Sequence, residues 1–361
     1  MFFDTLEVLN YRNYNKLKIK FSPSKNIIYG KNGSGKTNIV EALYVIGLTK
    51  SFRNTSERNL IYKEKSQSKI KAKVIKNSKK AKYEVDLFKD GKKVLIDNNV
   101  VGLLSNYISN IPIIVFFPDD LKLIKETPII RRKFLNVELS FNDRLYLINS
   151  TKYNKILKQR NSYLKQLQIN GNQSKEYLDI LTKKMIDYGK YIYNSRNEFI
   201  NYLNNNINYY YQKIAKKGTL KLRYISNFDL DDKKIIKKIN DLYQKELLFG
   251  KTLIGTHLDD IEFYLDDNKV KDWASEGQLK NIVISIKLVE VKYIYEKLGF
   301  YPILILDDLF SELDKEKINN IINLLPKDCQ IFITTTEISK IKKSLREDSK
   351  LFKINNGTIE E

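Results

Sequence analysis

A short glycine-rich segment constrains the fold more than any other part of the sequence. It matches the pattern G-x-x-x-x-G-K-[ST] and consists of Gly30, Lys31, Asn32, Gly33, Ser34, Gly35, Lys36 and Thr37. The apolar run 27–29 precedes it, and apolar residues at helical spacing follow over 39–46. A strand, a glycine-rich loop and a helix in this order are typical of the phosphate-binding loop, or P-loop. The segment therefore predicts an α/β fold with a parallel sheet and a nucleotide site at its carboxyl edge.

The residue types of this loop have chemical reasons to stand where they do. Glycines let backbone N–H groups close around a β-phosphate, and the start of the following helix adds its dipole. We expect Lys36 to reach the β- and γ-phosphates and to act in catalysis, and the Thr37 hydroxyl to bind Mg²⁺. The cofactors predicted from the loop are ATP and Mg²⁺. A glycine-rich turn that arose by chance is the weaker alternative.

Two adjacent carboxylates follow a second apolar run, residues 303–306. Four consecutive apolar residues are typical of a central parallel strand that is covered on both faces. Asp307 and Asp308 then stand at the sheet edge where ligands bind. We expect Asp307 to hold Mg²⁺ together with Thr37, and Asp308 to polarise an attacking water, so both are candidate catalytic residues. An exposed acidic turn is the alternative.

A third motif, Ser275-Glu276-Gly277-Gln278, begins a long amphipathic helix that we expect to end at Leu298. A serine hydroxyl and a helix N-terminus can clamp a γ-phosphate that a P-loop holds from its other side. Ser275, Gly277 and Gln278 are therefore candidate nucleotide-binding residues. The motif resembles the signature of ABC-type ATPases, in which the second face of the nucleotide site comes from another subunit. The resemblance implies an ATP-dependent homodimer, and it makes Asp314, in the expected D-loop 311–314, a further nucleotide contact.

The apolar patterns divide the chain into three parts. Residues 1–125 are predicted to form the N-terminal part of an ATPase head, residues 126–250 an inserted helical lobe, and residues 251–361 the rest of the head with signature, Walker B aspartate and D-loop. Strand-like alternation over 68–97, with a hairpin turn at Asp90-Gly91, predicts an antiparallel sheet. The expected fold class is α/β: an ABC-type P-loop ATPase head with a mixed sheet and an antiparallel β-subdomain, plus an inserted, mainly helical lobe.

Within the insert, residues 175–214 have a helical pattern without proline. We expect Gly189 and the asparagine run 204–206 to bend or break this helix, which favours a compact lobe over a coiled-coil arm. A strand over 220–225 and a helix over 232–248 complete the predicted lobe.

The chain carries a formal net charge of +21 over 361 residues. The positive excess lies in residues 1–250, whereas residues 251–361 are slightly acidic. Such a field attracts polyanions. Lys69, Lys71 and Lys73 alternate along one expected strand, where they either follow a phosphate backbone or simply solvate the outer face of a sheet. A compositional bias towards lysine is a second source of the excess.

Cysteine and histidine are scarce, with Cys329 and His257 as the single residue of each type. This excludes an intrachain disulfide and a His/Cys metal site. Asp4 and Glu7 interrupt the position of a signal peptide, and the longest apolar run, 111–117, is too short to span a bilayer. We therefore expect a cytoplasmic protein without membrane insertion.

Several further blocks extend the resemblance from one end of the chain to the other. They are Leu9 to Tyr14, Thr37 to Leu43, Ser51-Phe52-Arg53, Phe117-Pro118 through Pro128 to Arg131-Arg132, and Gly255 to Asp260. Together with the nucleotide motifs they resemble the RecF family of bacterial recombination mediators, within the ABC-type and SMC-like ATPases. The resemblance implies a protein that dimerises on ATP, binds duplex or gapped DNA without sequence preference, and works with RecR and RecO to load RecA in DNA repair and replication restart.

Two other classes share the nucleotide motifs. An SMC-like or nuclease-associated ATPase head is the runner-up, but it should carry a heptad arm or a cluster of metal-binding side chains. A transporter ATPase subunit should have its signature much closer to the P-loop. Transporters also place a switch histidine where Thr335 or Thr336 stands here, and Asp308 replaces a commoner glutamate. Both departures predict weak ATPase activity, used as a switch.

Some single residues have two readings. Arg131 and Arg132 either contact DNA or anchor the lobe to the head, and His257 either approaches the nucleotide or is structural. Trp273 is expected to pack rather than to stack on a base. Arg12 and Asn13 are expected near the adenine.

Overall fold

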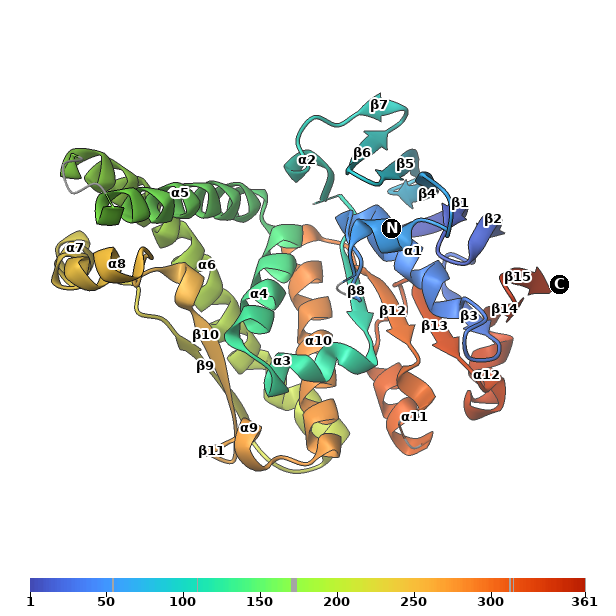
Figure 1. The fold of residues 1–361 in the computed structure, drawn as a ribbon. Helices are drawn as coiled ribbons and strands as arrows, with labels where there is room; N and C mark the ends of the chain where they lie inside the picture. The colour runs from blue at the N-terminus through green and yellow to red at the C-terminus, as the bar shows by residue number, and fades with distance from the viewer. Residues whose placement is uncertain (54, 109, 170–173, 312, 314, 361) are drawn as a thin grey trace. The chain divides into compact units, whose positions relative to one another are not determined.

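The computed structural model describes residues 1–361 except 54, 109, 170–173, 312, 314 and 361, and also without the side chains of residues 311 and 315. The order of the elements can be followed in Figure 1. The strands are β1 Phe2–Tyr11, β2 Tyr14–Lys20, β3 Lys25–Tyr29, β4 Gln67–Lys76, β5 Lys79–Phe88, β6 Gly91–Ile96, β7 Asn99–Val100, β8 Ile113–Phe116, β9 Leu220–Ile225, β10 Asp260–Leu265, β11 Asn268–Lys269, β12 Ile303–Asp307, β13 Ile331–Thr335, β14 Ser349–Asn355 and β15 Thr358–Glu360. The α-helices are α1 Lys36–Leu48, α2 Ser105–Ile108, α3 Lys122–Lys125, α4 Pro128–Asn142, α5 Arg144–Ile169, α6 Lys175–Ala215, α7 Asp232–Asp241, α8 Tyr243–Phe249, α9 Val270–Trp273, α10 Glu276–Leu298, α11 Lys315–Leu324 and α12 Lys343–Glu347.

The chain forms two compact units. The first consists of residues 1–121, 209–216 and 280–361, and the second of residues 122–208 and 217–279. Residues 251–279, which the sequence groups with the head, thus pack in the second unit, where β10 pairs with β9.

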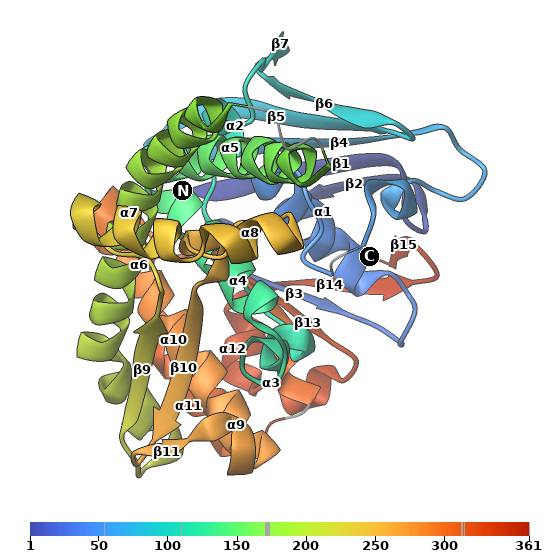
Figure 2. The ribbon, with the colours of Figure 1, turned by 60° about the vertical axis from the view of Figure 1, so that its left-hand side comes forward.

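Two six-stranded sheets build the first unit. The mixed sheet has the order β15-β14-β3-β13-β12-β8, and all of its neighbours pair in parallel except β14 and β15. The antiparallel sheet has the order β2-β1-β4-β5-β6-β7, and its long strands lie side by side in Figure 2. The predicted combination of a mixed sheet and an antiparallel β-subdomain is therefore confirmed.

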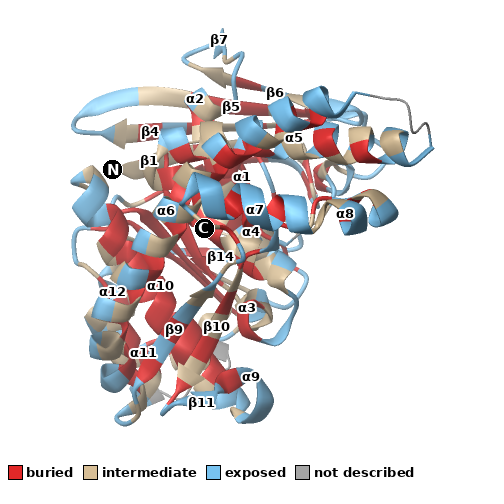
Figure 3. Cartoon of the chain, turned by 90° about the vertical axis from the view of Figure 1, so that its left-hand side faces the viewer, coloured by how far each residue is buried: buried red, intermediate tan, exposed pale blue. Residues whose placement is uncertain are grey.

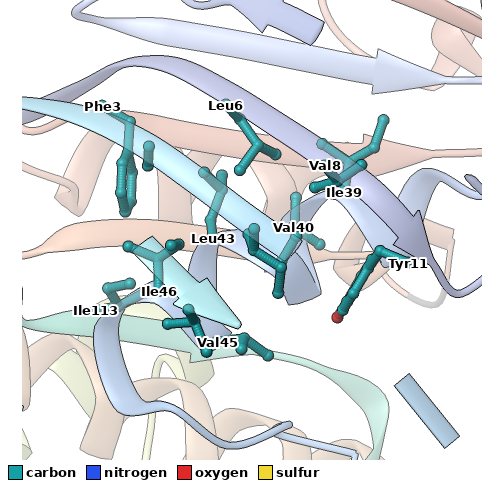
Figure 4. Close-up of a cluster of buried hydrophobic side chains, with 14 of the residues drawn as sticks. Phe3, Leu6, Val8, Tyr11, Ile39, Val40, Leu43, Val45, Ile46 and Ile113 are labelled. Carbon is teal, nitrogen blue, oxygen red and sulfur yellow. The ribbon is translucent and has the colours of Figure 1, made fainter. Parts of the chain in front are cut away.

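Helix α1 lies between these two sheets and joins them into one core. Its apolar side chains, among them Val40, Leu43 and Ile46, lie in the same buried cluster as Phe3 and Leu6 of β1 (Figure 4). A helix that packs against a sheet on each side must be apolar over most of its circumference, and α1 is. Each fully buried Leu or Ile contributes about 1.5–3 kcal/mol relative to exposure. The packing therefore fixes the helix that follows the P-loop.

The second unit contains helices α4 and α5, most of α6, and the three-stranded sheet β11-β10-β9. Buried positions of α5, β9 and β10 are coloured red in Figure 3. Helix α6 runs unbroken for 41 residues, so the predicted break at Gly189 and at the asparagines is wrong. A side chain at Gly189 would come within 2.7 Å of the Phe228 ring, which shows that the glycine makes room for packing.

Most other predicted elements are found where the sequence places them. Strand β9, helix α10 with Gly299 after its end, and strand β12 agree with the expected ranges to within a residue. The helix expected over 232–248 is instead two helices, α7 and α8, which meet at Leu242. No helix in the described part of the chain combines the length and apolarity needed to cross a membrane.

Candidate nucleotide site

The glycine-rich segment leads from β3 into α1, as the sequence predicts. Gly30, Gly33 and Gly35 have φ angles of +155°, +78° and +112°, values that side chains disfavour. Gly30 also lies against β14, because a Cβ atom there would be 2.2 Å from the carbonyl oxygen of Ile354. The loop conformation therefore depends on glycine at this position for two separate reasons.

Lys36 is buried and folds back over its own loop. Its Nζ atom donates hydrogen bonds to the carbonyl oxygens of Gly30 and Lys31, both at 2.8 Å. Burial lowers the pKa of Lys36, and the charges of Asp308 and Asp307 oppose this shift. The predicted catalytic lysine thus lies in the electrostatic field of both predicted carboxylates.

Asp307 is the last residue of β12 and Asp308 follows it. The single strand β13 separates β12 from β3. Thr334, on β13, donates its hydroxyl proton to Asp307 at 2.7 Å and accepts from the Asp308 N–H at 2.9 Å. Burial raises the pKa of Asp307, whereas hydrogen bonds from Thr334 and Thr37 lower it. Thr37, in α1, and Asp307 therefore lie close to each other, and Thr334 orients Asp307, a role that the sequence did not reveal. That the pair holds Mg²⁺ stays a prediction.

The signature residues lie at the exposed start of α10, in the second unit. The backbone N–H of Ser275 donates to Gln278 Oε1 at 2.8 Å, and the Gln278 N–H donates to Ser275 Oγ at 3.3 Å. This reciprocal pair is a capping box, which fixes the first turn of the helix. Gly277 has open space around its Cα, since only the Ser275 hydroxyl would come within 4.0 Å of an added Cβ. Asp314 lies outside the described residues, so its predicted role stays a prediction.

A buried glutamate in α1 organises a network that sequence reasoning missed. Glu41 accepts two hydrogen bonds from the Arg12 guanidinium, at 2.8 and 2.6 Å, and others from Tyr11 and Ser51. The pKa of Tyr11 is raised, and the largest cause is burial, which disfavours the ionised phenol. The network joins the β1–β2 turn to the segment after α1, two blocks that the family resemblance had singled out separately. A lone glutamate within the apolar part of the helix, residues 39–48, was the available signal.

The P-loop backbone is supported from outside by two donors. The Ser34 carbonyl accepts from Asn13 Nδ2 at 3.3 Å and from the backbone N–H of Gly357 at 3.0 Å. Asn38 in α1 also donates to Asn13, at 2.7 Å. In this structure Arg12 is bound to Glu41 and Asn13 to the loop backbone, so their expected position near the adenine remains a prediction. The role of Gly357, in the β14–β15 hairpin, had no signal in the sequence.

Arg131 and Arg132 bind Asp260 and Asp259, which the sequence assigns to the head and the structure places in the second unit. Arg131 is buried and forms a two-pronged ion pair with Asp260, and it also donates to the carbonyls of Leu123 and Glu126. Arg132 donates to the Asp259 carbonyl at 2.8 Å. Both side chains hold α4 against β10.

His257 and Trp273 can also be placed. The Tyr153 hydroxyl is 2.8 Å from His257 Nδ1, and the Thr252 carbonyl is 3.1 Å from Nε2, so both ring nitrogens are used inside the unit. This favours the structural reading of His257. Trp273 leaves 47% of its surface exposed, so the expectation that it packs rather than stacks on a base stays a prediction. Among the described residues, no three His, Cys, Asp or Glu side chains form a group that could hold a metal ion.

Residues 2–112 match the family model described as RecF/RecN/SMC N terminal domain. The chain is 34% identical to the DNA replication and repair protein RecF of Bacillus cereus (strain G9842), over 100% of this chain and 98% of that protein. It is 35% identical to RecF of Pediococcus pentosaceus, over 99% of this chain and 98% of that protein.

Solved structures give the same picture. A structure of the recombination mediator RecF with ATP, in the RecFOR pathway, superposes with a TM-score of 0.91 at 27% identity, covering 99% of this chain and 97% of that one. An Smc head bound to the C-terminal winged-helix domain of ScpA gives a TM-score of 0.56 at 14% identity, which shows the shared fold alone.

Proposed function

Because the chain belongs to the RecF family of DNA replication and repair proteins, we propose that it is a recombination mediator that binds DNA under the control of ATP. The observation that supports this most directly is the joint placement of Lys36, Thr37 and Asp307 at the carboxyl edge of the mixed sheet. The likeness to a solved RecF with ATP supports the same nucleotide.

The described residues fit the predicted ligands. Thr37 and Asp307 present neighbouring oxygen atoms, the donor type that Mg²⁺ prefers, and bound Mg²⁺ would neutralise phosphate charge. Lys36 would exchange its two carbonyl partners for phosphate oxygens, and Asp308 would orient a water. In this proposal the exposed Ser275 and Gly277 and the half-buried Gln278 contact the nucleotide of a second copy, so that ATP joins a homodimer. Hydrolysis is slow and serves as a switch.

DNA binding is supported by the arrangement of lysines on the outer face of the antiparallel sheet. One row across the strands is Lys18, Glu7, Lys71 and Glu84, in which the charges alternate. The neighbouring row is Lys20, Thr5, Lys73 and Lys82, which contains no carboxylate of its own. Strands lie about 5 Å apart, so this row presents cations at intervals that a phosphate backbone can follow.

The two rows offer a matched test. Lys20→Ala with Lys73→Ala should weaken binding to a duplex and flatten its salt dependence by roughly one to two counterions. Lys18→Ala with Lys71→Ala removes the same formal charge from the row with alternating signs and should have the smaller effect. Equal effects of the two pairs would contradict this placement of DNA.

The proposal as a whole is tested by DNA retention with ATP, with ADP and without nucleotide, each across a salt series. We expect retention with ATP, loss of nucleotide binding in Lys36→Ala, and loss of the dimer but not of ATP binding in Ser275→Arg. Equal sedimentation of the wild type with and without ATP would rule out the ATP-dependent dimer. RecR and RecO are the proposed partners, and the cytoplasm is the proposed compartment.

A further inference from the structure

Three large apolar side chains gather at one end of the second unit, where α5 and α8 finish. Ile169, Leu248 and Phe249 leave 80%, 67% and 59% of their surfaces exposed, and we call them the apolar tip. The Gln168 amide at the end of α5 donates to the Leu248 carbonyl at 3.0 Å, which holds the two helix ends together. The end of α8 is coloured as exposed in Figure 3.

The backbone under the tip is well ordered by hydrogen bonds. Gly250 ends α8 with a φ angle of +59°, and its N–H donates to the Leu247 carbonyl at 3.2 Å. The Lys251 N–H donates back to the Glu246 carbonyl at 3.2 Å, which completes a Schellman-type helix end. The exposed side chains are therefore held in place by a capped helix end.

Three exposed lysines lie at the tip among the described residues. Lys165, Lys245 and Lys251 are all exposed there, and the Lys165 side chain lies against Gly250. Glu246 is the one carboxylate within residues 243–251, and it points inward, where it forms an ion pair with the buried Arg160 at 2.7 Å. The surface at the tip is consequently both apolar and positive.

Such a surface is costly in water unless something covers it. Burial of apolar surface gains about 25 cal/mol per Å², and clustered exposed apolar side chains mark sites of protein association. We propose that the apolar tip is a docking site for an acidic segment of a partner protein that carries apolar side chains of its own. Aspartates or glutamates of the segment meet the three lysines, and its apolar side chains cover Leu248 and Phe249.

A protein segment fits the tip better than a nucleic acid does. Bases gain from stacking on aromatic rings, but two of the three tip residues are aliphatic and gain from burial against other apolar side chains. The inference goes beyond the proposed DNA-binding function and does not depend on it. DNA contact at the tip is an outcome that the test below can reveal.

The probe is a fluorescein-labelled synthetic peptide in which Asp alternates with Leu and Phe, and its control replaces each Asp with Lys. Fluorescence anisotropy against the full chain measures binding. We expect the acidic peptide to bind and the basic one to fail. Leu248→Ser with Phe249→Ser should weaken binding at least about tenfold, as loss of a central apolar contact does. Lys245→Glu should weaken it too, whereas Leu145→Ser, at a site 57% exposed elsewhere on α5, should not.

DNA retention of the same variants separates the possibilities. Unchanged retention in the Leu248→Ser, Phe249→Ser variant, together with lost peptide binding, supports the proposal. Failure of the wild type to bind the acidic peptide would overturn it. So would lost DNA retention with unchanged peptide binding, because the tip would then contact nucleic acid. Circular dichroism of each variant shows whether the fold is intact, and Lys245→Glu supplies a second, surface-only variant.

Discussion

Asn204 of α6 pairs with the backbone of Leu222 in β9 through both groups of its amide. Its Oδ1 accepts from the Leu222 N–H, and its Nδ2 donates to the Leu222 carbonyl, both at 2.8 Å. One helical turn later, Asn208 repeats this pairing with Leu220. Strand β9 is an edge strand of the three-stranded sheet. The two asparagine side chains pair with backbone N–H and carbonyl groups of β9 that no neighbouring strand binds.

This pairing predicts a measurable loss of stability. Asn204→Ala should lower the free energy of unfolding by about 1–3 kcal/mol, since both Leu222 backbone groups lose their partner. Asn205→Ala is the matched control, because Asn205 is exposed and alanine favours helix by about half a kcal/mol. Urea unfolding measures both. An Asn204→Ala variant as stable as the Asn205→Ala control would show that the pairing contributes little.

The close approach of Gly30 to β14 predicts a different response at two glycines of one loop. In Gly30→Ala the added methyl group meets the Ile354 carbonyl, so the loop or β14 must move. ATP binding should be lost, as measured by titration with a fluorescent ATP analogue. Gly33→Ala introduces no such contact and should cost only about 1–2 kcal/mol of backbone strain. Equal ATP affinities in the two variants would argue against this role of Gly30.

The ion pair between Arg12 and the fully buried Glu41 predicts a non-additive double mutant. Arg12→Ala leaves a buried carboxylate without its cation, which typically costs about 3–5 kcal/mol. Glu41→Gln in the same chain removes that charge and should restore part of the stability. Chemical unfolding of the single and double variants gives the coupling energy. If the stability losses of the two single variants simply add in the double variant, Arg12 does not stabilise the ionised form of Glu41.

The site residues that could be predicted from the sequence all belong to short, recognisable motifs. The P-loop, its flanking strand and helix, and the Asp307-Asp308 pair each occupy a few consecutive residues with a fixed chemical reason. The strand order determines how these segments are placed relative to one another, because β13 lies between β3 and β12 and supplies Thr334. No short pattern contains that information.

The wrong prediction in α6 has a similar origin. Gly189 and the asparagines have low intrinsic helix propensity, so the sequence pattern favoured a break. Their partners, Phe228 and strand β9, come later in the chain and outweigh that propensity by packing and hydrogen bonding. A short sequence pattern contains no information about partners far away in the chain. The network of Glu41 was not predicted for the same reason, because its partner Arg12 lies outside the helix.

The burial of His257 predicts a pH dependence of stability. Burial lowers its pKa from the ordinary value of 6.5, the charges of Arg132, Arg160 and Arg196 add to this, and the hydrogen bond to Thr252 opposes it. As the pH falls below about 6.5, His257 becomes protonated in the unfolded chain but stays neutral in the folded chain. The free energy of unfolding therefore decreases as the pH falls below this value. The slope can reach about 1.4 kcal/mol per pH unit for one proton. Because His257 is the single histidine, His257→Gln should remove this contribution, and urea unfolding of both proteins between about pH 5 and 7 measures it. Parallel stability curves for the two proteins would mean that His257 is protonated equally in the folded and unfolded chain.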